Sequence, residues 1–264
     1  MIKKDILNTQ SRVVLVTGGA RGIGWGIVKT FLNTDKTIAL CVDLNMPDEN
    51  SIKKLGVKAE SLYCYQANIT VEQEVADLYE QIKKRFKRVD ILINNAGIIY
   101  KDLIEDMNLQ KWNDILQVNL TGVMLMTKGV ALLMKEQKWG RIINISSIQA
   151  FIGTKVYGAY AATKTGVLGL TKVWAVELAE FNVTVNAICP GFAHTDMAEL
   201  FIDRITNENS ISREEALSQI IAPVPQKRLI EPEEIGSLAV FLASENARGI
   251  TGESIIISGG MVMH

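Results

Sequence analysis

The sequence is poor in the residues that build metal sites and disulfide frameworks. Its three cysteines, Cys41, Cys64 and Cys189, are far apart, and an odd number without close spacing argues against a disulfide framework. With two histidines and no Cys/His/Asp/Glu cluster of ligand spacing, no metal site is expected. No apolar run approaches the ~18 residues of a membrane span, and no secretory signal is visible. We therefore expect a cytoplasmic protein without a membrane partner.

The chain also lacks a strong charge of either sign. Its formal net charge of -1 is not that of a nucleic-acid binder, so no nucleic-acid partner is expected. Hydrophobic residues make up 48% and charged residues 22% of the 264 positions, as in an ordinary globular protein. Five prolines against 20 glycines indicate tight turns and close backbone approaches rather than a Pro-rich linker.

Short β-branched runs alternate with longer segments of helical periodicity. Most runs are continuously apolar, which is typical of parallel strands covered on both faces. We expect strands at Val13–Thr17, Thr37–Asp43, Ser61–Gln66, Ile91–Asn94, Ile142–Ser146, Val183–Ile188 and Ser254–Ile257. We expect helices at Ile23–Leu32, Val71–Phe86, Lys111–Lys135, Ala159–Glu180 and Pro232–Ala243.

This alternation predicts an α/β fold, a Rossmann-type, three-layer, doubly wound parallel sheet of about seven strands with helices on both faces. Residues 193–222 break the alternation and are followed by Pro223 and Pro225. We interpret this stretch as a helical substrate lid within a single catalytic domain, residues 1–264, rather than as a second domain.

A glycine-rich stretch, Thr17-Gly18-Gly19-Ala20-Arg21-Gly22-Ile23-Gly24, separates the first expected strand from the first expected helix. Glycines let backbone N–H groups approach a pyrophosphate, and the helix N-terminus adds a favourable dipole. A plain strand-to-helix turn would look similar. The strand before, the helix after and an acid at the end of the second strand favour dinucleotide binding.

That acid is Asp43. Its carboxylate can accept both adenosine ribose hydroxyls and would repel a 2′-phosphate, which favours NAD over NADP. A capping or turn-initiating Asp is the alternative. Arg21 keeps NADP open, because a cation in the glycine loop could contact a 2′-phosphate. No basic residue follows Asp43 directly, so NAD is the expected coenzyme.

Further motifs follow in order. Asn94-Asn95-Ala96-Gly97 follows the fourth expected strand, Asn119 lies in the next helix, and Ser146-Ser147 ends the fifth strand. Tyr160-Ala161-Ala162-Thr163-Lys164 begins a long helix. Together with the glycine-rich stretch, these motifs resemble the short-chain dehydrogenase/reductase family from about Arg12 to the C-terminus. The resemblance implies an NAD(P)-dependent oxidoreductase acting on CH–OH groups.

Tyr160 and Lys164 are four residues apart and therefore share one helix face. A nearby ammonium favours the phenolate, so we expect Lys164 to lower the pKa of Tyr160 from ~10 toward neutral and make it a general acid/base. The Ser147 hydroxyl would hydrogen-bond the substrate oxygen, and Ser146 would face the other way. Each residue alone is as compatible with an ordinary structural role, but the combination favours catalysis.

The resemblance assigns further roles. It implies that Asn119 is catalytic and holds a water that relays protons to Lys164, which would also bind the nicotinamide ribose. It places the Pro190–Thr195 stretch beside the nicotinamide and Asn68-Ile69 at the adenine. The implied coenzyme contacts are Gly18, Arg21, Gly22, Ile23, Gly24, Asp43, Asn68, Ile69, Asn95, Gly97, Tyr160, Lys164, Pro190, Gly191, Ala193 and Thr195.

The expected substrate pocket includes Ser147, Gln149, Tyr157 and Phe192, with Lys155 and Arg204 as mobile cations near it. The sequence is similar to diol, polyol and hydroxy-acid dehydrogenases, which predicts oxidation of a small secondary alcohol to a ketone. The alternatives are an NADPH-dependent 3-oxoacyl-(acyl-carrier-protein) reductase and a catalytically idle nucleotide-binding regulator. The resemblance, and apolar residues around the two longest helices, indicate a homotetramer built from two dimers.

Overall fold

The structure is a computed structural model that describes residues 11–56 and 59–263. Its centre is a seven-stranded sheet in the order β3-β2-β1-β4-β5-β6-β7, in which every neighbouring pair is parallel. The strands are β1 (Arg12–Thr17), β2 (Thr37–Asp43), β3 (Leu62–Gln66), β4 (Ile91–Asn94), β5 (Gly140–Ile145), β6 (Val183–Pro190) and β7 (Ser254–Ile257).

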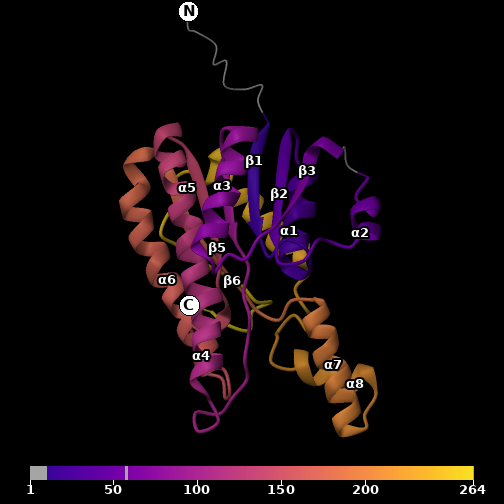
Figure 1. The fold of residues 1–264 in the computed structure, drawn as a ribbon. Helices are drawn as coiled ribbons and strands as arrows, with labels where there is room; N and C mark the ends of the chain where they lie inside the picture. Colours follow the sequence, from indigo (N-terminus) through magenta and orange to yellow (C-terminus); the bar gives the residue numbers. More distant parts are fainter. Residues whose placement is uncertain (1–10, 57–58, 264) are drawn as a thin grey trace, which may run out of the picture.

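Helices cover both faces of this sheet (Figure 1). One apolar core joins the sheet to α3 (Glu72–Phe86), α5 (Val123–Gln137) and α6 (Gly158–Leu178). A second core joins the opposite face to α1 (Gly22–Leu32) and α9 (Pro232–Leu242). The remaining α-helices described are α2 (Glu49–Lys54), α4 (Leu109–Leu116), α7 (Asp196–Asn209) and α8 (Arg213–Ile221). The predicted doubly wound α/β fold is confirmed.

The helices follow from local sequence chemistry. In α3, apolar residues three and four apart form the buried stripe of Val75, Leu78, Tyr79 and Ile82. Acidic residues occupy its first turn and basic residues its last, which complements the helix dipole. Gly26 lets α1 and α9 touch, because a Cβ on it would lie 2.3 Å from Pro232 Cβ.

The expected helix Lys111–Lys135 proves to be longer and interrupted. It comprises α4, a π-helical turn at Gln117–Gly122 and α5. By length and composition, Leu109–Gln137 is one stretch among the described residues that could cross a membrane, with a mean hydropathy of 1.4. Its Met126, Val130 and Met134 are instead buried against the sheet, as in the core helix of a globular fold.

A chain of buried polar side chains crosses the sheet and reaches two helices. Asn94 Nδ2 donates to Asn144 Oδ1 at 2.8 Å and to Thr127 Oγ1 at 3.0 Å. Asn144 Nδ2 in turn donates to Thr171 Oγ1 at 2.8 Å. Because buried amides must find hydrogen-bond partners, these bonds fix the positions of β4, β5, α5 and α6 relative to one another.

The sheet order reverses between β1 and β4. In open parallel sheets, ligands bind beyond the carboxyl ends of the strands at such a switch point. Figure 1 shows α7 and α8 beyond these ends, with the loop that leads into α4 at the same end of the sheet. The stretch expected to be a lid is therefore helical and lies at the binding edge.

Candidate active site

The loop after β1 has no room for a side chain at Gly18 or Gly24. Gly18 has a φ of 60°, and a Cβ on it would lie 2.8 Å from Ala96 Cα. A Cβ on Gly24 would lie 2.1 Å from the Gly18 oxygen. Gly22 has a φ of 55° and faces Thr195, whose Cγ2 would be 3.5 Å from an added Cβ. This backbone cradle at a helix N-terminus fits a pyrophosphate, and Thr195 lies beside it.

Asn95, which follows β4, connects the glycine loop after β1 to the neighbouring strand end by hydrogen bonds. Its Nδ2 donates to the oxygens of Thr17 (2.9 Å) and Gly18 (3.0 Å), and its backbone N–H donates to Thr17 Oγ1 (3.0 Å). Both amide hydrogens are thus used within the protein. Asn95 holds the loop in place, whereas the Arg21 side chain is exposed and Ile23 packs on the second core.

Polar side chains follow the two strands beyond β1. Asp43 ends β2, and its Oδ2 accepts a hydrogen bond from Ala20 N at 3.1 Å, so its carboxylate lies against the glycine loop. Asn68 follows β3, and its Oδ1 accepts from Thr70. Ile69 is buried against Gly122, where a Cβ would be 2.7 Å from Ile69 Cδ1. This edge has the acid and the apolar surface that an adenosine requires.

Ser147, Tyr160 and Lys164 converge. Ser147 follows β5, and its hydroxyl lies close enough to the Tyr160 phenol to act on the pKa of that phenol. Lys164, one turn further along α6, is buried, and its Nζ lies 5.5 Å from the Tyr160 ring centroid. Ser146 Oγ donates to the Lys164 carbonyl, so it braces the helix and turns away from the site. The constellation expected from the sequence is present.

In this arrangement of side chains, the pKa of Tyr160 is not lowered as the spacing of Tyr160 and Lys164 had predicted. Burial raises the pKa of Tyr160 to about 12, while the Ser147 hydroxyl acts in the opposite direction. Burial lowers the pKa of Lys164 to about 8. Lys164 Nζ donates to the Ile145 carbonyl at 2.8 Å rather than to the phenol. Burial of the phenol therefore sets the direction of the Tyr160 pKa shift, because it disfavours the charged phenolate.

Asn119 lies on the π-helical turn. Its Oδ1 accepts from Ile98 N (2.9 Å), and its Nδ2 donates to Ile98 O (3.0 Å) and to Thr163 Oγ1 (3.1 Å). Gly97 lies between this amide and Lys164, since an added Cβ would be 3.3 Å from Asn119 Oδ1 and 3.5 Å from Lys164 Nζ. Asn119 thus secures the loop after β4 beside α6.

The stretch after β6 lies across from the glycine loop, since Gly22 faces Thr195. Pro190 ends the strand, and Gly191 packs on Ser258, where a Cβ would be 3.0 Å from the Ser258 Cα. Ala193 forms an isolated parallel bridge with Ile230. Thr195 caps α7 by accepting a hydrogen bond from Ala198 N. The residues expected at the nicotinamide therefore connect the end of β6 to the start of α7.

Aromatic residues line the approach to Tyr160. The Tyr157 ring meets the Tyr160 ring edge-on, with centroids 6.4 Å apart. It follows Val156, whose φ of 72° is a rare conformation for a β-branched residue. Phe192 packs on the apolar cluster of α7 and α8. Gln149 is buried, and its Oε1 has no hydrogen-bond partner among the described residues, which suits a group that awaits a ligand.

Lys101 and Asp102, which were not expected from the sequence, also lie beside Tyr157. Lys101 Nζ lies 3.8 Å from the Phe201 ring centroid and 5.4 Å from that of Tyr157, so it links α7 to the pocket wall. Asp102 pairs with Lys111 at 2.7 Å and bridges to Tyr157. The available signal was their place four and five residues after Gly97. Of the expected cations, Arg204 pairs with Glu208 on its own helix.

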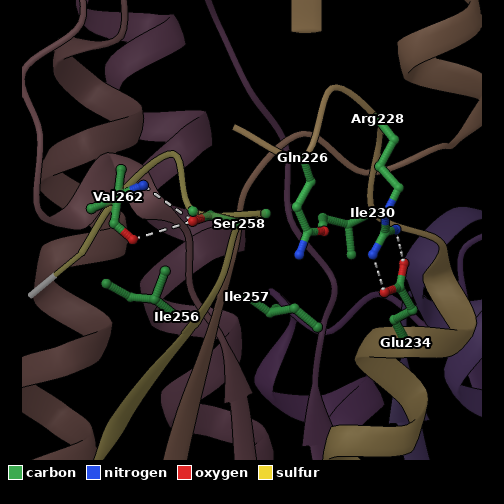
Figure 2. A pocket seen from close by; sticks show the side chains of 10 residues that line it. Gln226, Arg228, Ile230, Glu234, Ile256, Ile257, Ser258 and Val262 are labelled. Atoms are coloured by element: carbon green, nitrogen blue, oxygen red, sulfur yellow. Dashed lines mark hydrogen bonds and ion pairs between the residues drawn. The ribbon is translucent and has the colours of Figure 1, made fainter. Parts of the chain in front are cut away.

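A cavity of about 340 Å³ lies at the end of β7, and Ser147, Tyr160 and Lys164 do not line it (Figure 2). Arg228 and Glu234 form a bidentate ion pair on its wall, and Ser258 exchanges hydrogen bonds with the Val262 backbone. Because Ser258 also contacts Gly191, this cavity adjoins the loop after β6.

Comparisons with known proteins show the family of this chain. A family model described as "Enoyl-(Acyl carrier protein) reductase" matches residues 18–262. An uncharacterized oxidoreductase, YxjF, of Bacillus subtilis is 37% identical over 252 residues, covering 95% of this chain and 98% of the relative. The chain belongs to the short-chain dehydrogenase/reductase family.

Other members of the family are similarly close. The D-beta-hydroxybutyrate dehydrogenase of Rhizobium meliloti is 34% identical, with 95% of this chain and 98% of the relative covered. The 3-oxoacyl-[acyl-carrier-protein] reductase FabG of Aquifex aeolicus is 37% identical, with 97% and 99% covered. A crystal structure of a short chain dehydrogenase family protein from Francisella tularensis has a TM-score of 0.83 at 29% identity, covering 95% and 98%. This short-chain dehydrogenase/reductase is an NAD(P)-dependent oxidoreductase acting on CH–OH groups.

Proposed function

We propose that this enzyme reversibly oxidises the carbinol carbon of a small secondary alcohol, diol, polyol or hydroxy acid, with NAD as the hydride acceptor and Tyr160 as the general acid/base. A bound nicotinamide supplies the hydride chemistry. The observation that carries the proposal is the convergence of the Tyr160 phenol, the Ser147 hydroxyl and the buried Lys164 ammonium.

In this proposal the substrate oxygen lies between Ser147 and Tyr160. Ser147 donates a hydrogen bond to the oxygen as negative charge develops there. The raised pKa keeps Tyr160 protonated near neutral pH, ready to donate to a carbonyl oxygen, and the same atom takes the proton back in the oxidation direction. Lys164 binds the nicotinamide ribose, and Asn119 helps to relay protons to Lys164.

NAD is the proposed coenzyme because the Asp43 carboxylate lies beside the glycine loop, where it would repel a 2′-phosphate. Exposed Arg21 is the feature that favours NADP. Gly18, Gly22, Gly24 and Thr195 would surround the pyrophosphate. The other proposed contacts are Ile23, Asn68, Ile69, Asn95, Gly97, Pro190, Gly191 and Ala193.

Within the substrate range, Lys101 favours a hydroxy acid. Its ammonium contacts aromatic faces and has no ion pair within the described part of the chain. A cation over Tyr157, whose ring neighbours Tyr160, is suited to hold a substrate carboxylate. We further propose that residues 193–222 form a lid on a single catalytic domain, with Phe192 and Phe201 facing the substrate, and that the enzyme is cytoplasmic.

The decisive experiment compares initial rates with NAD, NADH, NADP and NADPH on 3-hydroxybutyrate, acetoin, sorbitol and acetoacetyl-CoA. We expect NAD-dependent oxidation, with Tyr160→Phe reducing turnover by about 10²- to 10⁴-fold while coenzyme affinity is retained. Tyr65→Phe, on remote β3, is the matched control. Lys101→Met should raise KM for hydroxy acids more than for neutral diols. Equal turnover by Tyr160→Phe would refute the catalytic assignment.

A second candidate is NADPH-dependent 3-oxoacyl-(acyl-carrier-protein) reduction, which is favoured by the 37% identity to the Aquifex aeolicus FabG. Against it, exposed Glu177 and Glu180 at the end of α6 would repel an acidic carrier. Faster turnover of acetoacetyl-CoA with NADPH than of any alcohol with NAD would establish this candidate.

A regulator that binds nucleotide without turnover is a candidate from another class. It would bind coenzyme with no measurable hydride transfer on any of the four substrates. The presence of Ser147, Tyr160 and Lys164 in one site argues against it.

We also propose a homotetramer of two dimers. Apolar side chains are exposed on α5 and α6, including Leu132 (70% exposed) and Val176 (81% exposed). An open apolar groove lies between the same helices, lined by Leu120, Thr121, Met124, Gly166 and Leu170. A monomer mass in light scattering at micromolar concentration would contradict this assembly.

A further inference from the structure

Two cysteines that are far apart in the sequence lie opposite each other in the sheet. Cys41 on β2 and Cys64 on β3 are direct partners in the parallel register. Neighbouring strands are about 4.8 Å apart, which lies within the Cα–Cα range that a disulfide spans. Both cysteines are free, and both side chains belong to the same apolar cluster.

The two thiols differ in surroundings. Cys41 is 1% exposed, whereas Cys64 is half-buried on β3, the edge strand of the sheet. The proximity of the two thiols lowers the pKa of Cys64 and raises that of Cys41. Cys64 is therefore the thiol that solvent reaches and that ionises first, and Cys41 is the partner behind it.

Cys41 also supports the coenzyme loop. A Cβ on Gly19 would lie 3.0 Å from Cys41 Sγ, so the sulfur packs directly beneath the loop backbone. Two residues further along β2, Asp43 accepts a hydrogen bond from Ala20 N. If Sγ turned toward β3 to bond Cys64, the loop would lose this packing contact.

We propose that Cys64 and Cys41 are a peroxide-oxidisable dithiol whose disulfide loosens the glycine loop and weakens coenzyme binding. The Cys64 thiolate attacks one oxygen of hydrogen peroxide, the O–O bond breaks, and hydroxide leaves, giving a sulfenic acid. The Cys41 sulfur then attacks the Cys64 sulfur, the S–O bond breaks, and the hydroxyl leaves as water with the Cys41 proton. Two thiols lose two electrons, and the peroxide is reduced to two waters.

The test uses the full, reduced protein exposed to hydrogen peroxide, followed by thiol counting in denaturant and peptide mapping. The count should fall from three thiols to one, with a Cys41–Cys64 peptide and an intact mass lower by about 2 Da, reversed by dithiothreitol. Cys64→Ser should keep its two thiols. Cys189→Ser, the matched control, should lose both of its thiols.

Coenzyme affinity is measured on the same samples by NADH fluorescence. The oxidised protein should bind NADH at least about threefold more weakly than the reduced protein, and dithiothreitol should restore affinity. Three surviving thiols, stable addition of oxygen without a cross-link, or a disulfide that includes Cys189 would overturn the dithiol. A Cys41–Cys64 disulfide with unchanged NADH affinity would overturn its link to the coenzyme. Because the mapping needs no turnover, these outcomes are independent of the proposed substrate.

Discussion

Replacement of Gly24 by alanine tests the backbone cradle directly. The new Cβ would lie 2.1 Å from the Gly18 oxygen and 2.5 Å from Asn95 Nδ2, so the loop or the Asn95 amide must move. Overpacking of this kind costs about 1–3 kcal/mol. Loss of the Asn95 hydrogen bond to Gly18 adds about 1 kcal/mol. We therefore expect a total penalty of about 3 kcal/mol.

The penalty can fall on coenzyme binding or on folding, and two assays separate these outcomes. Calorimetric titration with NAD should show affinity reduced roughly 100-fold if the loop relaxes into a shape that cannot receive a pyrophosphate. Thermal unfolding should instead show Tm lower by about 5–10 °C if the strain persists in the folded protein. Gly249→Ala is the control, because nothing lies within 4 Å of its Cβ position. Unchanged affinity and unchanged Tm in Gly24→Ala would refute the steric reasoning.

Three further predictions concern charge and buried polarity. Asp43→Asn should raise the NADP-to-NAD ratio of kcat/KM by about tenfold, measured against Asp35→Asn. Hydrogen bonds and charge from Glu231 and Glu199 raise the pKa of His194, so its stabilisation is full below pH about 6.5 and is lost as pH rises through the folded value. The Tm of the wild type should therefore be higher than the Tm of His194→Gln at pH 5.5, and this difference in Tm should vanish at alkaline pH. Asn144→Leu should destabilise by about 1–3 kcal/mol in chemical denaturation, since buried Asn94 loses a partner.

Much of the fold could be predicted because parallel strands buried on both faces leave an unmistakable apolar signature. The expected bounds of β2, β4 and β7 match the structure. The π-helical turn at Gln117–Gly122 could not be predicted, because one extra residue in a helical turn hardly changes the apolar period. Short α2 contributes no buried residue, so it has no apolar stripe to detect.

The sequence predicted that Tyr160 and Lys164 lie together, because this follows from residue type and spacing. Spacing could not reveal how deeply the phenol is buried, and this burial raises the pKa of Tyr160 rather than lowering it. Nor could spacing reveal that Cys41 and Cys64 are neighbours, because their pairing depends on the register of two strands. Lys101 likewise became visible only through its contacts with Tyr157 and Phe201.

The helices α7 and α8 have a small apolar core of their own, centred on Ile202, Ala216 and Ile220 and distinct from the two cores that hold the sheet. Because this cluster is separate, substitutions within α7 and α8 need not disturb the packing of the sheet. Changes confined to this segment could therefore alter the substrate that the enzyme accepts, while the two cores that stabilise the sheet stay the same.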